Sequence, residues 1–155
     1  EITANARKYM GNSPARITGV LVQEMLKDGV EVIVGSTRDP VFGHVLMFGL
    51  GGIYVEAMKD VSFRITPLTH NDARDMILQI RGSRVLQGMR SQPPVDMDAL
   101  VDVLLRISAL VSDHGDAIAE LDINPLVVSA GGAKVADALI VKNKVPAKEP
   151  ELPIQ

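Results

Sequence analysis

Alternating apolar and polar positions divide the first part of the chain into strand-like segments joined by short polar turns. Gly19–Leu26 and Val30–Ser36 are rich in Val, Leu and Ile, and the turn Lys27-Asp28-Gly29 between them contains the Asp-Gly pair typical of a β-hairpin. A second turn at Arg38-Asp39-Pro40 leads into a third apolar segment, Val41–Gly49. This order predicts a meander of antiparallel strands.

The period then changes to that of helices. Glu1–Met10, which precedes the meander, has the character of a helix end. After the meander, a short strand is expected at Phe63–Pro67. Apolar residues recur every three or four positions in Asn71–Arg81 and again in the segment that follows Asp96, which is a good N-cap residue. His114-Gly115 is expected to end this second helix.

The last structured part is expected to be a pair of strands, Ala117–Ser129 and Lys134–Val141, joined by Gly131-Gly132. Strands, helices and strands follow one another without a regular βαβ alternation. This order favours an α+β fold with a largely antiparallel sheet and helices packed on one face. We expect residues 1–142 to form one domain and residues 143–155 to form an extended tail or linker.

Composition narrows the function. The 155 residues include no cysteine, which excludes disulfides, thiolate metal sites and cysteine nucleophiles. Sixteen Lys and Arg against 19 Asp and Glu give a net charge of −3, without the basic surface that nucleic-acid binding requires. No apolar run approaches the roughly 20 residues of a membrane span. The chain starts at Glu1, no signal-peptide pattern is recognisable near it, and we expect it to be part of a longer protein.

The segment Ala119–Pro125 carries the densest cluster of candidate site residues. Alternation places Glu120, Asp122 and Asn124 together on one face of the strand. Pro125 interrupts the ladder, so the strand is expected to bend there or to lie at an edge of the sheet.

Asp137 is a charged residue on an otherwise apolar row of the partner strand. A two-residue turn at Gly131-Gly132 would place Leu126 opposite Asp137 and Asn124 opposite Leu139, so that Asn124 and Asp137 are diagonal neighbours. An amide oxygen with one or two carboxylates suits Mg²⁺, which takes its other ligands from water and phosphates. From the spacing alone, a solvated polar face with Asp137 paired to a lysine is the favoured interpretation at this point.

A second candidate site is the segment Gln23-Glu24-Met25-Leu26, followed by Glu31. Its backbone can offer a donor and an acceptor to the edge of an adenine, a carboxylate can accept from ribose hydroxyls, and the apolar side chains can form the floor of a pocket. The alternative is a plain hairpin with exposed acids.

The glycine cluster Gly49-Leu50-Gly51-Gly52 is a weak signal for phosphate binding. No Gly-Lys-Ser/Thr follows it, and the next residues resemble a strand, so it fits neither a Walker A loop nor a dinucleotide fingerprint. The three histidines, His44, His70 and His114, have no metal-ligand spacing, and a surface role is expected for each.

Several ordered motifs together resemble the NDP-forming acyl-CoA synthetases. They are VQEM at Val22–Met25, EVIVG at Glu31–Gly35, the long run from Arg38 to Leu68, LQGMR at Leu86–Arg90 and ELDINPLVV at Glu120–Val128. The resemblance extends from about Gly19 to Val141. It implies the carboxy-terminal lobe of an ATP-grasp domain, similar to the β subunit of ADP-forming acetyl-CoA synthetase; succinyl-CoA synthetase β chains are more distant.

This resemblance implies a cytoplasmic ligase that couples acyl-CoA to ATP/ADP through acyl phosphate and a phosphohistidine. It implies Mg²⁺ as cofactor, bound by Asn124 and Asp137, and therefore favours the metal interpretation of that pair. It implies further roles, which are nucleotide binding for Gln23, Glu24, Met25, Leu26 and Glu31, a place near the phosphohistidine for Asp122, and a phosphate-transfer loop containing Gly51, Gly52 and Glu56.

The family also implies partners for this lobe. The amino-terminal ATP-grasp lobe, the CoA-binding domains and the phosphorylated histidine are not in this sequence, so the chain alone is expected to be inactive. Two alternatives remain: a regulatory nucleotide-binding module of a fused protein acetyltransferase, and a structural domain without catalysis.

Overall fold

A computed structural model describes residues 1–11, 16–26, 28–52, 60–88 and 93–143. The described helices are α1 (Ile2–Met10), α3 (His70–Gln79), α4 (Met97–Asp113) and the short 3₁₀ helix η1 (Arg81–Val85). The described strands are β1 (Val30–Asp39), β2 (Gly43–Leu50), β3 (Val61–Ile65), β4 (Ile118–Ser129), β5 (Gly132–Val135) and β6 (Ala138–Lys142). None of the described helices is long and apolar enough to cross a membrane.

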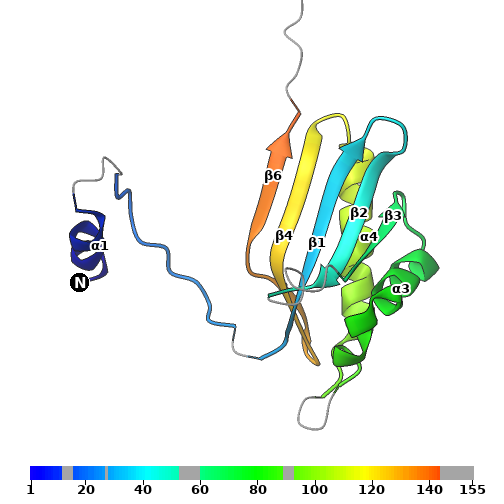
Figure 1. Ribbon diagram of the computed structural model, residues 1–155, viewed down its shortest axis with the longest axis horizontal. Helices are drawn as coiled ribbons and strands as arrows, with labels where there is room; N and C mark the ends of the chain where they lie inside the picture. Colours follow the sequence, from blue (N-terminus) through cyan, green and yellow to red (C-terminus); the bar gives the residue numbers. More distant parts are fainter. Residues whose placement is uncertain (12–15, 27, 53–59, 89–92, 144–155) are drawn as a thin grey trace, which may run out of the picture.

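The strands form one antiparallel sheet with the order β3-β2-β1-β4-β5. Strand β6 also pairs with β4, along a different part of that strand from β5. Helices α3 and α4 cover one face of this sheet (Figure 1). The predicted α+β architecture is therefore confirmed. Helix α1 stands apart from the sheet, at the far end of residues 16–26, and has no buried residue.

The core lies between the sheet and the helices α3 and α4. It is almost entirely aliphatic, and Phe48 is its aromatic member among the described residues. Strand β4 shows why the core forms here, because its buried residues alternate with exposed ones over most of its length. The fully buried side chains include Val32, Val34, Leu46, Met76, Ile77, Leu100, Leu104 and Leu126.

The strand predicted at Gly19–Leu26 is wrong. The described residues of this segment have no strand structure, and the meander begins only at β1. Val20, Leu21 and Val22 are 50%, 79% and 89% exposed. A strand needs the hydrogen bonds of a neighbouring strand, and none of the described strands lies beside this segment.

The surface role expected for all three histidines is wrong for His44, which is only 5% exposed. Its Nδ1 lies 3.0 Å from Ser36 Oγ, and its Nε2 lies 3.3 Å from the carbonyl oxygen of Gly115. His44 thus satisfies its polar atoms inside the fold and connects β1 and β2 with the turn after α4. His70 and His114 are exposed, as expected.

Both predicted helices are present and have capped amino termini. In α3, Thr69 and Asp72 form a reciprocal capping box. In α4, the Asp96 carboxylate accepts a hydrogen bond from the N–H of Ala99 at 2.9 Å. The N–H of Asp96 donates to the carbonyl oxygen of Ser129 at 2.9 Å, which joins the start of α4 to the end of β4.

The cap gives a first prediction. Replacing Asp96 with Ala leaves the N–H of Ala99 without its acceptor and should lower the free energy of unfolding by about 0.5–2 kcal/mol. Urea denaturation followed by circular dichroism measures this change. Asp113→Ala, at the other end of α4, is the matched control and should change stability by less than about 0.5 kcal/mol. Equal stabilities for the two variants would contradict the assigned role of the cap.

Candidate functional site

The sheet face opposite α3 and α4, here called the open face, carries the polar residues of β4. Glu120, Asp122 and Asn124 are exposed there, while Leu121 and Ile123 point into the core. The predicted alternation is therefore confirmed. Strand β4 is central, with β1 on one side and β5 and β6 on the other. Of the two alternatives expected at Pro125, the edge position is therefore wrong, whereas an interruption of the strand at this residue is present.

A β-bulge lies where Pro125 interrupts the pairing with β1. Val32 pairs with Leu126 and Val34 pairs with Ile123, so that Ile33 faces both Asn124 and Pro125. The extra residue in β4 absorbs the interruption and keeps Ile123 and Leu126 both in the core. Asn124 remains on the open face as a result.

Asn124 and Asp137 are directly opposite each other. The N–H of Asn124 donates to the carbonyl oxygen of Asp137 at 3.2 Å, and Asp122 pairs with Leu139. The predicted pairing of Leu126 with Asp137 is wrong by two residues, because Leu126 pairs with Val135. A shift of two residues preserves the face, so Asn124 and Asp137 are closer neighbours than the diagonal pair expected.

The turn between β4 and β5 explains this register. Ser129 pairs with Gly132, so the turn consists of Ala130 and Gly131 instead of Gly131 and Gly132. Ser129 Oγ accepts a hydrogen bond from the N–H of Gly131 at 3.1 Å. A serine hydroxyl that accepts a hydrogen bond from the backbone N–H two residues later favours a turn at these positions.

The chemistry of the Asn124–Asp137 pair fits a hard cation. Each side chain can offer an oxygen atom as a metal ligand on the open face. Oxygen is the ligand atom that Mg²⁺ prefers. No salt bridge of Asp137 to a lysine occurs within the described residues; its Oδ1 accepts from the N–H of Ala138 at 2.9 Å. The same part of the chain contains no group of three acids, histidines or cysteines placed for a metal. The remaining ligands of a Mg²⁺ here would have to be water or phosphate.

Glu31 lies beside the end of the glycine cluster. Its carbonyl oxygen accepts a hydrogen bond from the N–H of Gly51 at 2.7 Å. A Cβ atom on Gly51 would lie 3.0 Å from the carbonyl carbon, the Cβ and the oxygen of Glu31, and one on Gly52 would lie 3.9 Å from Glu31 Oε2. The backbones approach so closely that a side chain at position 51 would press on the backbone of Glu31. Glu56, the third residue expected in this loop, lies outside the described residues.

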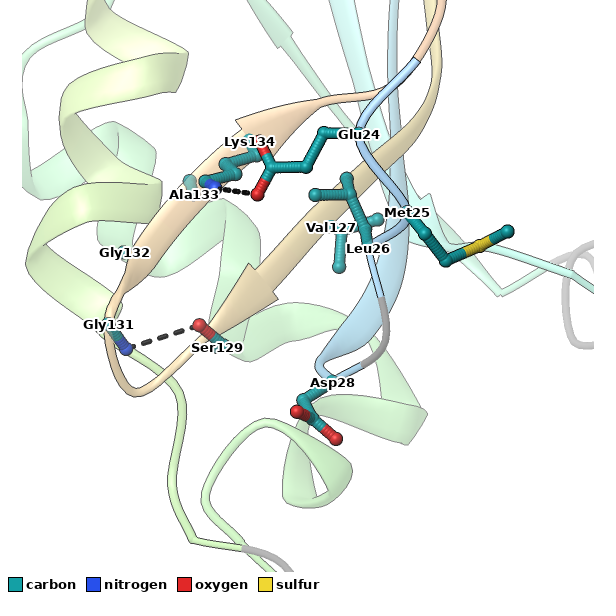
Figure 2. Close-up of a pocket in the computed structure, with 10 residues that line it drawn as sticks. All are labelled: Glu24, Met25, Leu26, Asp28, Val127, Ser129, Gly131, Gly132, Ala133 and Lys134. Atoms are coloured by element: carbon teal, nitrogen blue, oxygen red, sulfur yellow. Dashed lines mark hydrogen bonds and ion pairs between the residues drawn. The ribbon is translucent and has the colours of Figure 1, made fainter. Parts of the chain in front are cut away.

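Glu24, Met25 and Leu26 line a cavity of about 480 Å³ (Figure 2). One wall is the segment before β1, and the other is the β4–β5 hairpin, which contributes Val127 and Lys134. An adjoining cavity of about 410 Å³ includes Gln23. The structure thus brings the predicted nucleotide segment against a second wall that sequence reasoning missed.

Lys134 is the charged member of that second wall. Its Nζ lies 2.7 Å from Glu24 Oε1, and both side chains are more than half exposed. Lys134 pairs with Val127 across the hairpin, and Val127 pairs with Glu31 in β1. The predicted nucleotide residues Glu24 and Glu31 therefore lie on the same row at one end of the open face, with Val127 and Lys134 between them.

The predicted metal pair lies one row farther along the sheet. Asn124 faces Ile33, which is two residues after Glu31 in β1. Two strand residues span about 7 Å, so the carboxylate of Glu31 and the Asn124–Asp137 pair occupy adjacent rows. Asp122 lies opposite Gly35, one row farther still.

Beside Asp122 the open face is hollowed into a groove of about 610 Å³, lined by Gly35, Met47, Phe63, Glu120 and Asp122 among others. One side of the groove is acidic and the other is apolar. The alternation of apolar and polar residues in β2 and β3 is the sequence signal that could have predicted the apolar side of this groove. At one end, the N–H groups of Phe42 and Val41 donate to Asp39, and these bonds lower the pKa of its carboxyl group.

Comparison with known proteins places these features in a family context. The family model of an ATP-grasp domain matches residues 1–141. The β subunit of an acetate–CoA ligase [ADP-forming] II from Pyrococcus furiosus is 53% identical over 143 residues, which cover 91% of this chain and 60% of that protein.

Two solved structures of the dinucleotide-forming acetyl-coenzyme A synthetase 1 of Ca. Korarchaeum cryptofilum are also similar. One, in complex with coenzyme A, Ca-AMPCP and HgCl⁺, has a TM-score of 0.82 and 43% identity, covering 92% of this chain and 61% of that chain. The other, in complex with coenzyme A and Mg-AMPPCP, has a TM-score of 0.74 and 44% identity, covering 78% and 56%. The chain thus spans about three fifths of the length of these proteins.

The close approach of Gly51 to Glu31 gives a second prediction. Gly51→Ala forces backbone atoms apart and should lower the free energy of unfolding by about 1–3 kcal/mol. Gly19→Ala is the matched control, because a Cβ there meets nothing within 4 Å. Thermal denaturation of the two variants makes the comparison, and a Gly51→Ala protein as stable as the unchanged chain would contradict the contact.

Proposed function

The chain belongs to the ATP-grasp domain family, and we propose on that basis that it is the nucleotide- and Mg²⁺-binding lobe of an ADP-forming acyl-CoA synthetase. The observation that carries this proposal is the arrangement of the open face. A cavity lined by Glu24 and Leu26, the carboxylate of Glu31 and the Asn124–Asp137 pair follow one another along a single surface. A nucleotide needs these three kinds of group in this order: a pocket for the base, an acceptor for the ribose and a cation for the phosphates.

The base would lie in the cavity between residues 23–26 and the β4–β5 hairpin. Met25 and Leu26 offer apolar surface, and the backbone of the segment offers a donor and an acceptor to the edge of the base. Glu24 and Glu31 are the acceptors available to ribose hydroxyls.

Asn124 and Asp137 would hold Mg²⁺ when the nucleotide is bound, and the cation would supply charge neutralisation on the phosphate oxygens. Phosphoryl transfer depends mainly on positioning and on neutralising charge, so a lobe that provides both is suited to it. The relative crystallised with Mg-AMPPCP supports this choice of cation and ligand.

Asp122, Gly51, Gly52 and Glu56 are proposed to serve the transfer of the phosphoryl group. Asp122 lies one row beyond the proposed metal pair and borders the groove on the open face. Its carboxylate would then contact a histidine that enters from a partner domain. In the relative crystallised with Mg-AMPPCP, a phosphohistidine segment points towards the nucleotide binding site, which supports this placement.

The complete enzyme would also contain the amino-terminal ATP-grasp lobe and the CoA-binding domains, and it would act on an acyl-CoA. The exposed side chains of Val20, Leu21 and Val22 support the first of these partners. Their sequence favours a strand, and a sheet from the amino-terminal lobe would supply the hydrogen bonds and the cover that the described strands do not give.

Titration of the chain with Mg–ADP tests the nucleotide site. We expect NMR shifts centred on Glu24, Asn124 and Asp137, because these residues would surround the ligand. The same titration without Mg²⁺ should lose the shifts of Asn124 and Asp137 first. Shifts confined to the helix side of the sheet would contradict the proposed site.

A substitution in the complete enzyme gives a third prediction. Asp137→Ala removes a direct ligand of the cation and should lower kcat/KM by about 100-fold or more, since even indirect partners of a metal typically contribute 10- to 100-fold. Asp102→Ala, on the exposed side of α4 and paired with Arg106, is the control and should retain activity. A wild-type rate for Asp137→Ala would contradict the metal assignment.

A further inference from the structure

The cavity proposed for the base has two walls that come from distant parts of the sequence. One wall is the β4–β5 hairpin. The other wall is formed by the last residues of the segment 16–26, and this whole segment is here called the linker. The linker has no helix or strand structure. The volume of the cavity therefore depends on whatever holds the linker against the hairpin.

The hairpin wall is firmly placed. Val127 and Lys134 pair within the ladder, Ser129 Oγ closes the turn, and the carbonyl oxygen of Ser129 accepts from the N–H of Asp96 at the start of α4. The Cα atom of Lys134 is thus fixed by the sheet and by a helix.

The linker wall has one polar tie to the rest of the described chain, the ion pair between Glu24 Oε1 and Lys134 Nζ at 2.7 Å. Figure 2 shows this pair joining the linker to the β4–β5 hairpin, with Leu26 beside Val127 below it. Both cavities share Glu24, Leu26 and Lys134 in their lining. The ion pair therefore sits where the two cavities meet.

We propose that Lys134 is a positioning residue for the nucleotide, because its ion pair with Glu24 holds the linker at the distance from the β4–β5 hairpin that forms the base cavity. This inference rests on the proposed function and assigns to that site a residue outside the predicted set. A ligand that contacts both walls must in turn strengthen the ion pair, because coupling between two binding events is reciprocal.

The expected effect is modest because both partners are exposed. Pairs of this kind contribute little on their own, so Lys134→Met should weaken nucleotide binding by about two- to fivefold. The effect should diminish at high salt, which screens exposed charges.

The experiment uses the whole chain and four variants: Lys134→Met, Lys134→Arg, Glu24→Gln and the Lys134→Met/Glu24→Gln double variant. Heteronuclear ¹⁵N relaxation measures the order of the amides of residues 19–26 without ligand. Chemical-shift titrations then measure binding of Mg–ADP and of adenosine. Adenosine has no phosphate, so it separates positioning of the base from a direct contact between Lys134 and phosphate.

We expect Lys134→Met and Glu24→Gln to increase linker motion equally, with no further increase in the double variant and little change in Lys134→Arg. We expect Lys134→Met to weaken Mg–ADP and adenosine by the same factor. Lys142→Met, an exposed lysine on β6 outside the described salt bridges, is the control for loss of a positive charge.

Two outcomes would overturn the inference: unchanged linker motion in Lys134→Met, or weaker binding of Mg–ADP with unchanged binding of adenosine. The second would make Lys134 a phosphate contact. If neither ligand binds the unchanged chain but the linker still loosens in Lys134→Met, the positioning contact stands and the proposed nucleotide site fails.

Discussion

The alternation of side chains along β4 is the constraint on which the rest of the structure depends. This strand pairs on both sides, so its direction fixes β1 on one side and β5 and β6 on the other. One of its faces supplies core residues beneath α4, and the other carries Glu120, Asp122 and Asn124. The bulge at Asn124 and Pro125 keeps the two faces in phase along the strand. If the ladder continued without the bulge, Leu126 and Val128 would turn out of the core.

Local patterns were sufficient wherever a local interaction decides the structure. The two capped helices, the exposed face of β4 and the placement of Asn124 and Asp137 on the same face all follow from periods of 3.6 and 2 residues. The register of the β4–β5 hairpin did not follow, because a hydrogen bond from Gly131 to the Ser129 side chain selects a different turn. The error of two residues was harmless to the site, since a strand returns to the same face after two residues.

Features that depend on contacts between distant segments could not be predicted from the sequence. The segment Gly19–Leu26 has the composition of a strand, yet it lacks a neighbouring strand among the described residues, and composition does not reveal whether a partner is present. His44 is buried because Ser36 and Gly115 happen to satisfy both ring nitrogens. Lys134 meets Glu24 across 110 positions of sequence, so its role follows from the path of the linker and from no motif.

The hydrogen bond between the N–H of Asp96 and the carbonyl oxygen of Ser129 separates two roles of one position. The side chain of Asp96 begins a helix on the covered side of the sheet, whereas its backbone secures the hairpin that borders the cavity on the other side. Every amino acid except proline keeps that backbone donor. A substitution at this position can therefore weaken the helix while the hydrogen bond to the hairpin remains. Proline lacks the N–H and would disturb both layers of the domain at once.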